Sequence, residues 1–150
     1  VANTIALRDS GGNLTATNFL GTASSAKYAD LAEIYASDKQ YSPATVVVFG
    51  GTAEVTTTTK THDTRVAGVV STNPAYLMNE GTPGVAVALQ GRVPCQVVGT
   101  VRRGDRMVTS DIPGVAMTNN NPEVGTVIGK ALSTYSGEEV GVIEVVVGRI

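Results

Sequence analysis

The sequence lacks most of the residue types on which common catalytic and metal-binding sites depend. Its 150 residues include one histidine, one cysteine and no tryptophan. A zinc site requires three or four ligands, and a serine protease triad requires a histidine held by an acidic partner. The spacing of acidic ligands in an EF-hand loop is also absent. We therefore expect neither a metal nor a cofactor, and we interpret His62 as a solvated loop residue.

Charged residues and long apolar runs are equally scarce. Only 16% of the residues are charged, and the net charge is -2. This balance excludes binding of nucleic acid through a basic surface, and two Phe and five Tyr are few for stacking on bases. No apolar run approaches the ~18 residues that a transmembrane helix requires. We expect no nucleic-acid partner and no membrane insertion.

The single cysteine, Cys95, cannot form a disulfide within the chain. Alternation along residues 91–97 places it on the same face of a strand as Val93 and Val97. No basic residue or histidine adjoins Cys95 in the sequence to activate its thiol. We therefore predict that Cys95 is a small, buried core residue.

The residues that are abundant favour β-structure. About a third of the chain is Val, Thr or Ile, which lose side-chain freedom in helices and pack well on pleated sheets. Seventeen Gly and six Pro provide the turns that many short strands require. The composition predicts an all-β fold, a compact barrel or sandwich of short antiparallel strands.

The chain divides into two regions of different character. Residues 1–40 are small and polar, and residues 4–8 and 13–17 alternate around an Asp-Ser-Gly-Gly turn, which predicts a β-hairpin at a stalk junction. Residues 41–150 are expected to form the barrel or sandwich. An isolated hairpin cannot bury its own apolar side chains. We expect five residues of the first region to contact neighbouring chains: Ile5, Leu7, Leu14, Phe19 and Leu20.

Apolar runs separated by turn residues indicate the strands. Residues 25–35 fit a helix by their periodicity, but they also fit a strand. Gln90 and Gly91 are interpreted as a turn between two strands. The last strand is apolar on both faces apart from Glu144, which predicts a central position. The expected strands are 46–49, 53–60, 65–71, 85–89, 92–98, 106–109, 115–117, 125–132 and 139–147.

Two local clusters are the remaining candidates for chemistry. Arg102, Arg103 and Arg106 form the main basic cluster, which is typical of a solvated strand end. The second cluster is Ser25 with Asp30 and Glu33, because carboxylates close to a serine can assist an acyl shift that cleaves the backbone. The alternative is that Asp30 and Glu33 have no chemical role and lie on the polar face of an element that leads into the barrel.

Several short stretches resemble phage tail fibres. Residues 4–14 are similar to their short hairpin repeats, with an alternating strand, an Asp-x-Gly turn and a second strand. Other stretches resemble the G2-type C-terminal domains of phage appendages and tail fibres, and their order and spacing carry the resemblance. These stretches are 26–33, 65–74, 87–94, 104–105 and 129–132.

The resemblance implies a virion appendage in which this domain caps a stalk and forms a homotrimer. In some members of the family the domain is an intramolecular chaperone that cleaves itself off between an Asp and a Ser, with a Glu taking part. Ser25 aligns with that serine, but Ser24 stands where the family has Asp. An uncleaved trimerising tip is therefore the preferred interpretation. The alternatives are a self-cleaving chaperone and a tip that binds host surface polysaccharide.

Overall fold

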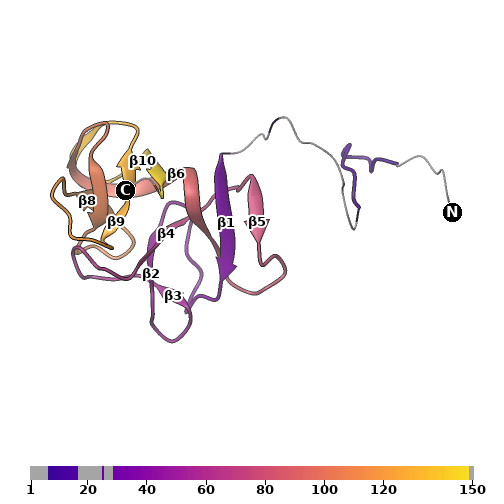
Figure 1. Ribbon diagram of the computed structural model, residues 1–150, viewed down its shortest axis with the longest axis horizontal. Coiled ribbons are helices and arrows are strands. Elements are labelled where there is room, and N and C mark those ends of the chain that lie inside the picture. Colours follow the sequence, from indigo (N-terminus) through magenta and orange to yellow (C-terminus); the bar gives the residue numbers. More distant parts are fainter. Residues whose placement is uncertain (1–6, 17–24, 26–28, 149–150) are drawn as a thin grey trace.

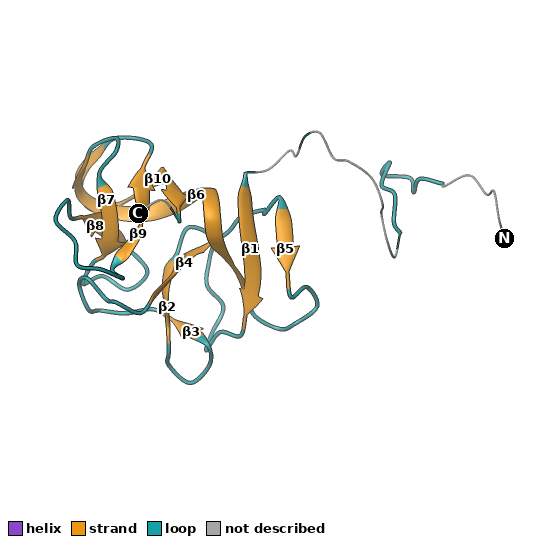
Figure 2. Ribbon diagram, viewed as in Figure 1, coloured by secondary structure: helices purple, strands orange, loops and turns teal. Residues whose placement is uncertain are grey.

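A computed structural model of the chain describes residues 7–16, 25 and 29–148. These residues form strands and loops with no helix, which confirms the all-β prediction (Figures 1 and 2). The strands are β1 (Asp30–Tyr35), β2 (Val46–Phe49), β3 (Val55–Thr56), β4 (Val66–Val70), β5 (Tyr76–Met78), β6 (Val85–Val101), β7 (Arg106–Thr109), β8 (Ala116–Thr118), β9 (Val127–Ala131) and β10 (Tyr135–Val147).

Five strands close into a small barrel. The order β10-β9-β7-β8-β6 is completed by a further antiparallel pairing of β10 with β6, from Tyr135 opposite Val101 to Val147 opposite Gly91. The sheet continues outside the barrel from the first part of β6. There β4 pairs with β6 and is followed by β2 and β3, and β1 also pairs with β6 and is followed by β5. Figure 1 shows β8, β9 and β10 at one end of this body and β1 and β5 at the other.

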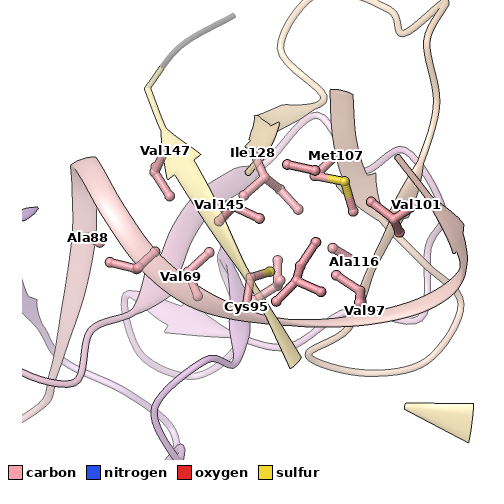
Figure 3. Close-up of a cluster of buried hydrophobic side chains, with 14 residues drawn as sticks. Val69, Ala88, Cys95, Val97, Val101, Met107, Ala116, Ile128, Val145 and Val147 are labelled. Atoms are coloured by element: carbon pink, nitrogen blue, oxygen red, sulfur yellow. The ribbon is translucent and has the colours of Figure 1, made fainter. Parts of the chain in front are cut away.

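The interior of the barrel is filled by aliphatic side chains (Figure 3). Cys95 is fully buried there beside Val93 and Val97, as the alternation predicts. Met107 is the largest of the fully buried side chains. Burying aliphatic side chains of this kind stabilises the fold by roughly 1.5–3 kcal/mol each.

A second cluster lies on the other face of the sheet next to the barrel. Val46 and Val69 pack into the barrel core, whereas their chain neighbours Val47 and Val70 pack into this second cluster. β2 and β4 are therefore buried on both faces, which explains their continuous runs of valine. Tyr35, at the end of β1, is partly buried and packs against this cluster.

β6 corrects the prediction of a turn at Gln90 and Gly91. The chain continues through both residues as one strand of 17 residues. Its first part pairs with β1 and β4, and its second part pairs with β10. Gly91 has a φ of 108°, and a Cβ atom at this position would collide with the carbonyl oxygen of Ala29. The glycine permits a close strand approach here and does not mark a turn.

The sequence of residues 25–35 fitted either a helix or a strand, and the structure has a strand over the last six of these residues. β1 pairs in antiparallel fashion with β6 and in parallel with β5. The sheet therefore includes residues 30–35 of the segment expected to act as a connector. β5 was not expected, because its three residues carry no clear alternation.

β10 is central only over part of its length. Val145, Val146 and Val147 pair with β9 as well as with β6, in agreement with the prediction. Val140 and Val142, however, are 45% and 59% exposed. The apolar pattern on both faces thus marks burial at the end of this strand and an exposed apolar face nearer its middle.

We expect Gly91→Ala to destabilise the fold by roughly 3 kcal/mol or more, since it combines an unfavourable φ with a backbone collision. Gly99→Ala in the same strand is the matched control, because Gly99 has a φ of 80° and no atom within 4 Å of an added Cβ. It should cost only about 1–2 kcal/mol. Urea denaturation of both variants measures the difference. Equal losses would show that the close approach of Ala29 does not constrain residue 91.

Candidate functional site

A pocket of about 390 Å³ lies where the two parts of the sheet system meet. It is bordered by the start of β1, the connection from β4 to β5, the middle of β6 and one residue of β10. Its lining combines acidic, hydroxyl, amide and guanidinium groups with apolar walls. The lining residues are Ala29, Asp30, Ser71, Thr72, Asn73, Arg92, Val93, Pro94 and Glu144.

Backbone hydrogen bonds fix the segments that carry these side chains. The amide of Arg92 donates to the carbonyl of Ala29 over 3.2 Å, and the amide of Ala75 donates to the carbonyl of Asp30 over 2.8 Å. The amide of Ser71 donates to the carbonyl of Ala86 over 2.8 Å. Asp30 and Ser71 are therefore held by main-chain contacts, and their side chains do not serve to anchor the chain.

Two buried polar atoms of this pocket have no hydrogen-bond partner among the described residues. They are Oδ2 of Asp30 and Oγ of Ser71. The two residues are only 6% and 7% exposed. A buried polar atom without a partner costs roughly 1–3 kcal/mol, and more if it is charged. Native proteins rarely accept such a cost without a structural or functional reason.

The mouth of the pocket carries a weak ion pair. Arg92 Nη1 lies 3.5 Å from Glu144 Oε2, and both side chains are more than half exposed. Pairs of this kind contribute little to stability. The Arg92 guanidinium thus pairs with Glu144, and no hydrogen bond or ion pair among the described residues joins it to Asp30.

Of the predicted cluster of Ser25, Asp30 and Glu33, the structure places the two acids in different surroundings. Asp30 borders the pocket, but Glu33 accepts a hydrogen bond of 2.7 Å from the hydroxyl of Tyr35. This carboxylate, together with burial, raises the pKa of Tyr35 to about 12. Ser25 is exposed, and its neighbours on both sides lie outside the described residues.

His62 and Asp63 take part in separate structural contacts. The carboxylate of Asp63 accepts hydrogen bonds from the guanidinium of Arg65 and from the hydroxyl of Thr58, the shortest being 2.7 Å from Arg65 Nη2. Nε2 of His62 instead lies 3.2 Å from the side-chain nitrogen, Nδ2, of Asn119. The hydrogen bonds from Arg65 hold the pKa of Asp63 well below its ordinary value.

The predicted basic cluster lies at a strand end, as expected. Two of its arginines donate hydrogen bonds to backbone carbonyls of neighbouring segments. Arg103 Nε donates to the carbonyl of Leu132 over 3.0 Å, and Arg106 Nη1 donates to that of Asn120 over 2.8 Å. Arg106 also borders a second cavity, of about 370 Å³, beside the loop of residues 121–127. The Arg106 guanidinium is thus held by a loop carbonyl, and none of the buried side-chain atoms without a partner among the described residues belongs to this cavity.

Sequence reasoning singled out Asp30 but missed Ser71 and Asn73. The run Ser-Thr-Asn-Pro at 71–74 follows a buried strand, and this abrupt change to polar residues was the available signal. Among the described residues, no group of three or more His, Cys, Asp or Glu is placed to hold a metal ion. No helix in this part of the chain is long and apolar enough to cross a membrane.

We expect Asp63→Asn to destabilise the protein by roughly 2 kcal/mol at neutral pH, because buried charged hydrogen bonds are lost. The pKa of Asp63 is lowered from 3.8 by folding, so its stabilising effect is complete above that pH and is lost as the pH falls below it. The difference from the wild type should therefore shrink in acid. Urea denaturation across the pH range measures this, with the exposed Asp111→Asn as control. A difference that does not change with pH would contradict the assignment.

Burial raises the pKa of the Cys95 thiol to about 12. The thiolate is the reactive form, so we expect native Cys95 to resist a disulfide reagent at neutral pH. The same reagent should react quickly once the chain is unfolded in denaturant. Spectrophotometric assay of the released thiol measures both rates, and rapid labelling of the native protein would contradict the burial.

The sequence matches no model of a known protein family and no curated protein. The resemblance to fibre domains therefore depends on its short motifs alone. Any function has to be argued from the side chains and surfaces described above.

Proposed function

We propose that this chain is the trimerising end domain of a fibre of the phage tail-fibre type, with a structural role in a virion. The observation that carries the proposal is the exposure of two leucines in the N-terminal segment. Leu7 is 85% exposed and Leu14 is 48% exposed. Large apolar side chains on either side of an ordered turn are typical of surfaces that another chain covers.

The turn between these leucines is well ordered by its own polar groups. The Asp9 carboxylate accepts hydrogen bonds from the amides of Gly11 and Asn13, at 2.9 and 2.8 Å. The amide of Asp9 also donates to the carbonyl of Asn13 over 2.9 Å. This supports the predicted turn at residues 9–12. The leucines are thus presented by a fixed turn and not by a featureless chain.

Three of the five predicted contact residues lie outside the described residues, namely Ile5, Phe19 and Leu20. Leu7 and Leu14 therefore carry the argument. The barrel also suits a structural cap, because the edge strands that lie outside it, β3 and β5, are only two and three residues long, and short edges reduce aggregation between sheets. These features favour a homotrimer in which the hairpin segments of three copies cover one another.

Light scattering after size exclusion tests the proposal. We expect three times the chain mass of 15.4 kDa, and we expect Leu7→Asp with Leu14→Asp to shift the protein toward the monomer. Burying two charged groups in an apolar interface is strongly unfavourable. Val124→Asp is the control, since Val124 is 98% exposed in a loop of the body.

The body of the double variant should unfold at the same denaturant concentration as an isolated wild-type monomer, which separates dissociation from misfolding. A wild-type protein that remains a monomer at millimolar concentration would refute the trimer. A trimer that survives both charges would place the interface elsewhere.

A further inference from the structure

We propose that the contact between His62 and Asn119 is an acid-sensitive device, which holds the loop of residues 119–126 while the imidazole is neutral and releases it when the imidazole is protonated. The inference goes beyond the trimerising role and does not depend on it. It starts from the distance of 3.2 Å between His62 Nε2 and Asn119 Nδ2. Two nitrogens at this distance form a hydrogen bond only if one donates and the other accepts.

A backbone amide fixes the orientation of the Asn119 side chain. The amide of Asn121 donates to Asn119 Oδ1 over 2.9 Å. A backbone N–H donates and cannot accept, so its partner is the oxygen of the side-chain amide, and the nitrogen faces the imidazole. Because an amide nitrogen only donates, Nε2 of His62 has to be the acceptor. The contact therefore requires the neutral ring with its proton on Nδ1.

Protonation of the ring removes this acceptor. In the imidazolium both ring nitrogens donate, so His62 Nε2 and Asn119 Nδ2 would face each other with hydrogens. Rotating the side-chain amide by half a turn does not help, because its nitrogen would then face the N–H of Asn121. No orientation of this amide satisfies both neighbours when the ring is charged. Histidine side chains commonly change charge between about pH 5 and 8, so the contact is present at the upper end of this range and lost toward the lower end.

The part of the loop that depends on the contact is residues 121–125. Asn119 is held to β7 in either state, since its amide donates to the carbonyl of Arg106 over 2.9 Å. Asn120 is held as well, because its Oδ1 accepts from the amide of Arg106 over 3.0 Å. Residues 121–125 border the second cavity, of about 370 Å³. Acid is therefore expected to loosen the wall of this cavity and to leave the barrel intact.

The other charged groups around the contact do not change their charge over the same range. His62 lies in the loop between β3 and β4, and its amide donates to the carbonyl of Thr109 at the end of β7 over 3.1 Å. Carboxylates ordinarily titrate at about pH 4, and the side chains of Lys and Arg above about pH 10. Neither of the two ion pairs among the described residues includes His62. The charged residues of this loop, of β7 with its flanking turns and of residues 119–126 are Lys60, Asp63, Arg65, Asp105, Arg106, Asp111 and Glu123.

Nuclear magnetic resonance of the assembled protein provides the test, and the single histidine of the chain makes its ring easy to assign. We expect proton–nitrogen correlation spectra at about pH 8 to show a proton on Nδ1 and none on Nε2. Amide hydrogen exchange, corrected for the intrinsic effect of pH, reports on the loop. The protection of the Asn121 amide should fall by about threefold or more between about pH 8 and 5.5, as expected for the loss of one hydrogen bond. The amide of Ala131, which donates to the carbonyl of Asp105 over 2.9 Å, should keep its protection.

Asn119→Asp is the decisive variant, because a carboxylate keeps one oxygen for the amide of Asn121 and offers the other to a protonated ring. We expect the ring to donate from Nε2 in this variant, and we expect the loss of Asn121 protection in acid to disappear. A contact with only a structural role would not change its response to pH in this way.

His62→Asn is the second variant. Residue 62 has a φ of 54°, and Asn adopts this left-handed conformation more readily than most residues. Because Asn does not titrate and lacks the ring, we expect Asn121 to be as weakly protected at about pH 8 as it is in the wild type at about pH 5.5, with little change between the two.

Several results would overturn the proposal. A wild-type ring with its proton on Nε2 at about pH 8 would show that this atom is not the acceptor. Protection of Asn121 that is unaffected by pH, or that falls equally in Asn119→Asp, would show that the charge of the ring does not control the loop. An equal fall in His62→Asn would assign the effect to another group. If Asn119→Asp does not fold, the wild-type tautomer and His62→Asn still decide the case.

Discussion

The architecture depends on one strand, β6, which is shared by the barrel and by the part of the sheet outside it. The first part of β6 pairs with β1 and β4, and its second part pairs with β10 to close the barrel. Gly91 lies where one set of partners gives way to the other, with Asp30 and Val147 opposite it on β1 and β10. A side chain at this position would strike the backbone of Ala29, so the absence of one lets three strands converge. Without that convergence, the barrel and the rest of the sheet would not share a strand.

The pocket is a consequence of the same convergence. Where β6 changes partners, the residues that follow Gly91 face groups from elements that are distant in sequence. Glu144 pairs with Pro94 across the β6–β10 ladder, and Asp30 begins the strand on the other side. Ser71 directly follows β4, and its amide donates to the carbonyl of Ala86. The pocket at this point is thus lined by polar side chains from segments whose backbones are already hydrogen-bonded.

Local chemistry made much of this fold predictable, and long-range pairing made the rest unpredictable. β-propensity and turn residues located β2, β4 and β7, because each is a short apolar run between clear turns. The same rule failed at Gly91, because a glycine that permits close approach looks identical in sequence to one that makes a turn. Asp30 could be singled out as an acid near a serine, but the serine with which it borders a pocket is Ser71, which only the folded sheet brings to the same site.

Two buried aspartates show why the unpartnered atoms matter. Asp63 is fully buried, and guanidinium, hydroxyl and amide donors surround its carboxylate, so the fold compensates its charge completely. Asp30 is almost as buried, yet Oδ2 has no partner among the described residues. The same chain therefore contains one site that satisfies a buried carboxylate and one that leaves a buried carboxylate oxygen without a partner. A purely structural carboxylate would be expected to resemble Asp63. The contrast marks Asp30, and not Asp63, as the carboxylate whose burial costs the described part of the fold stability.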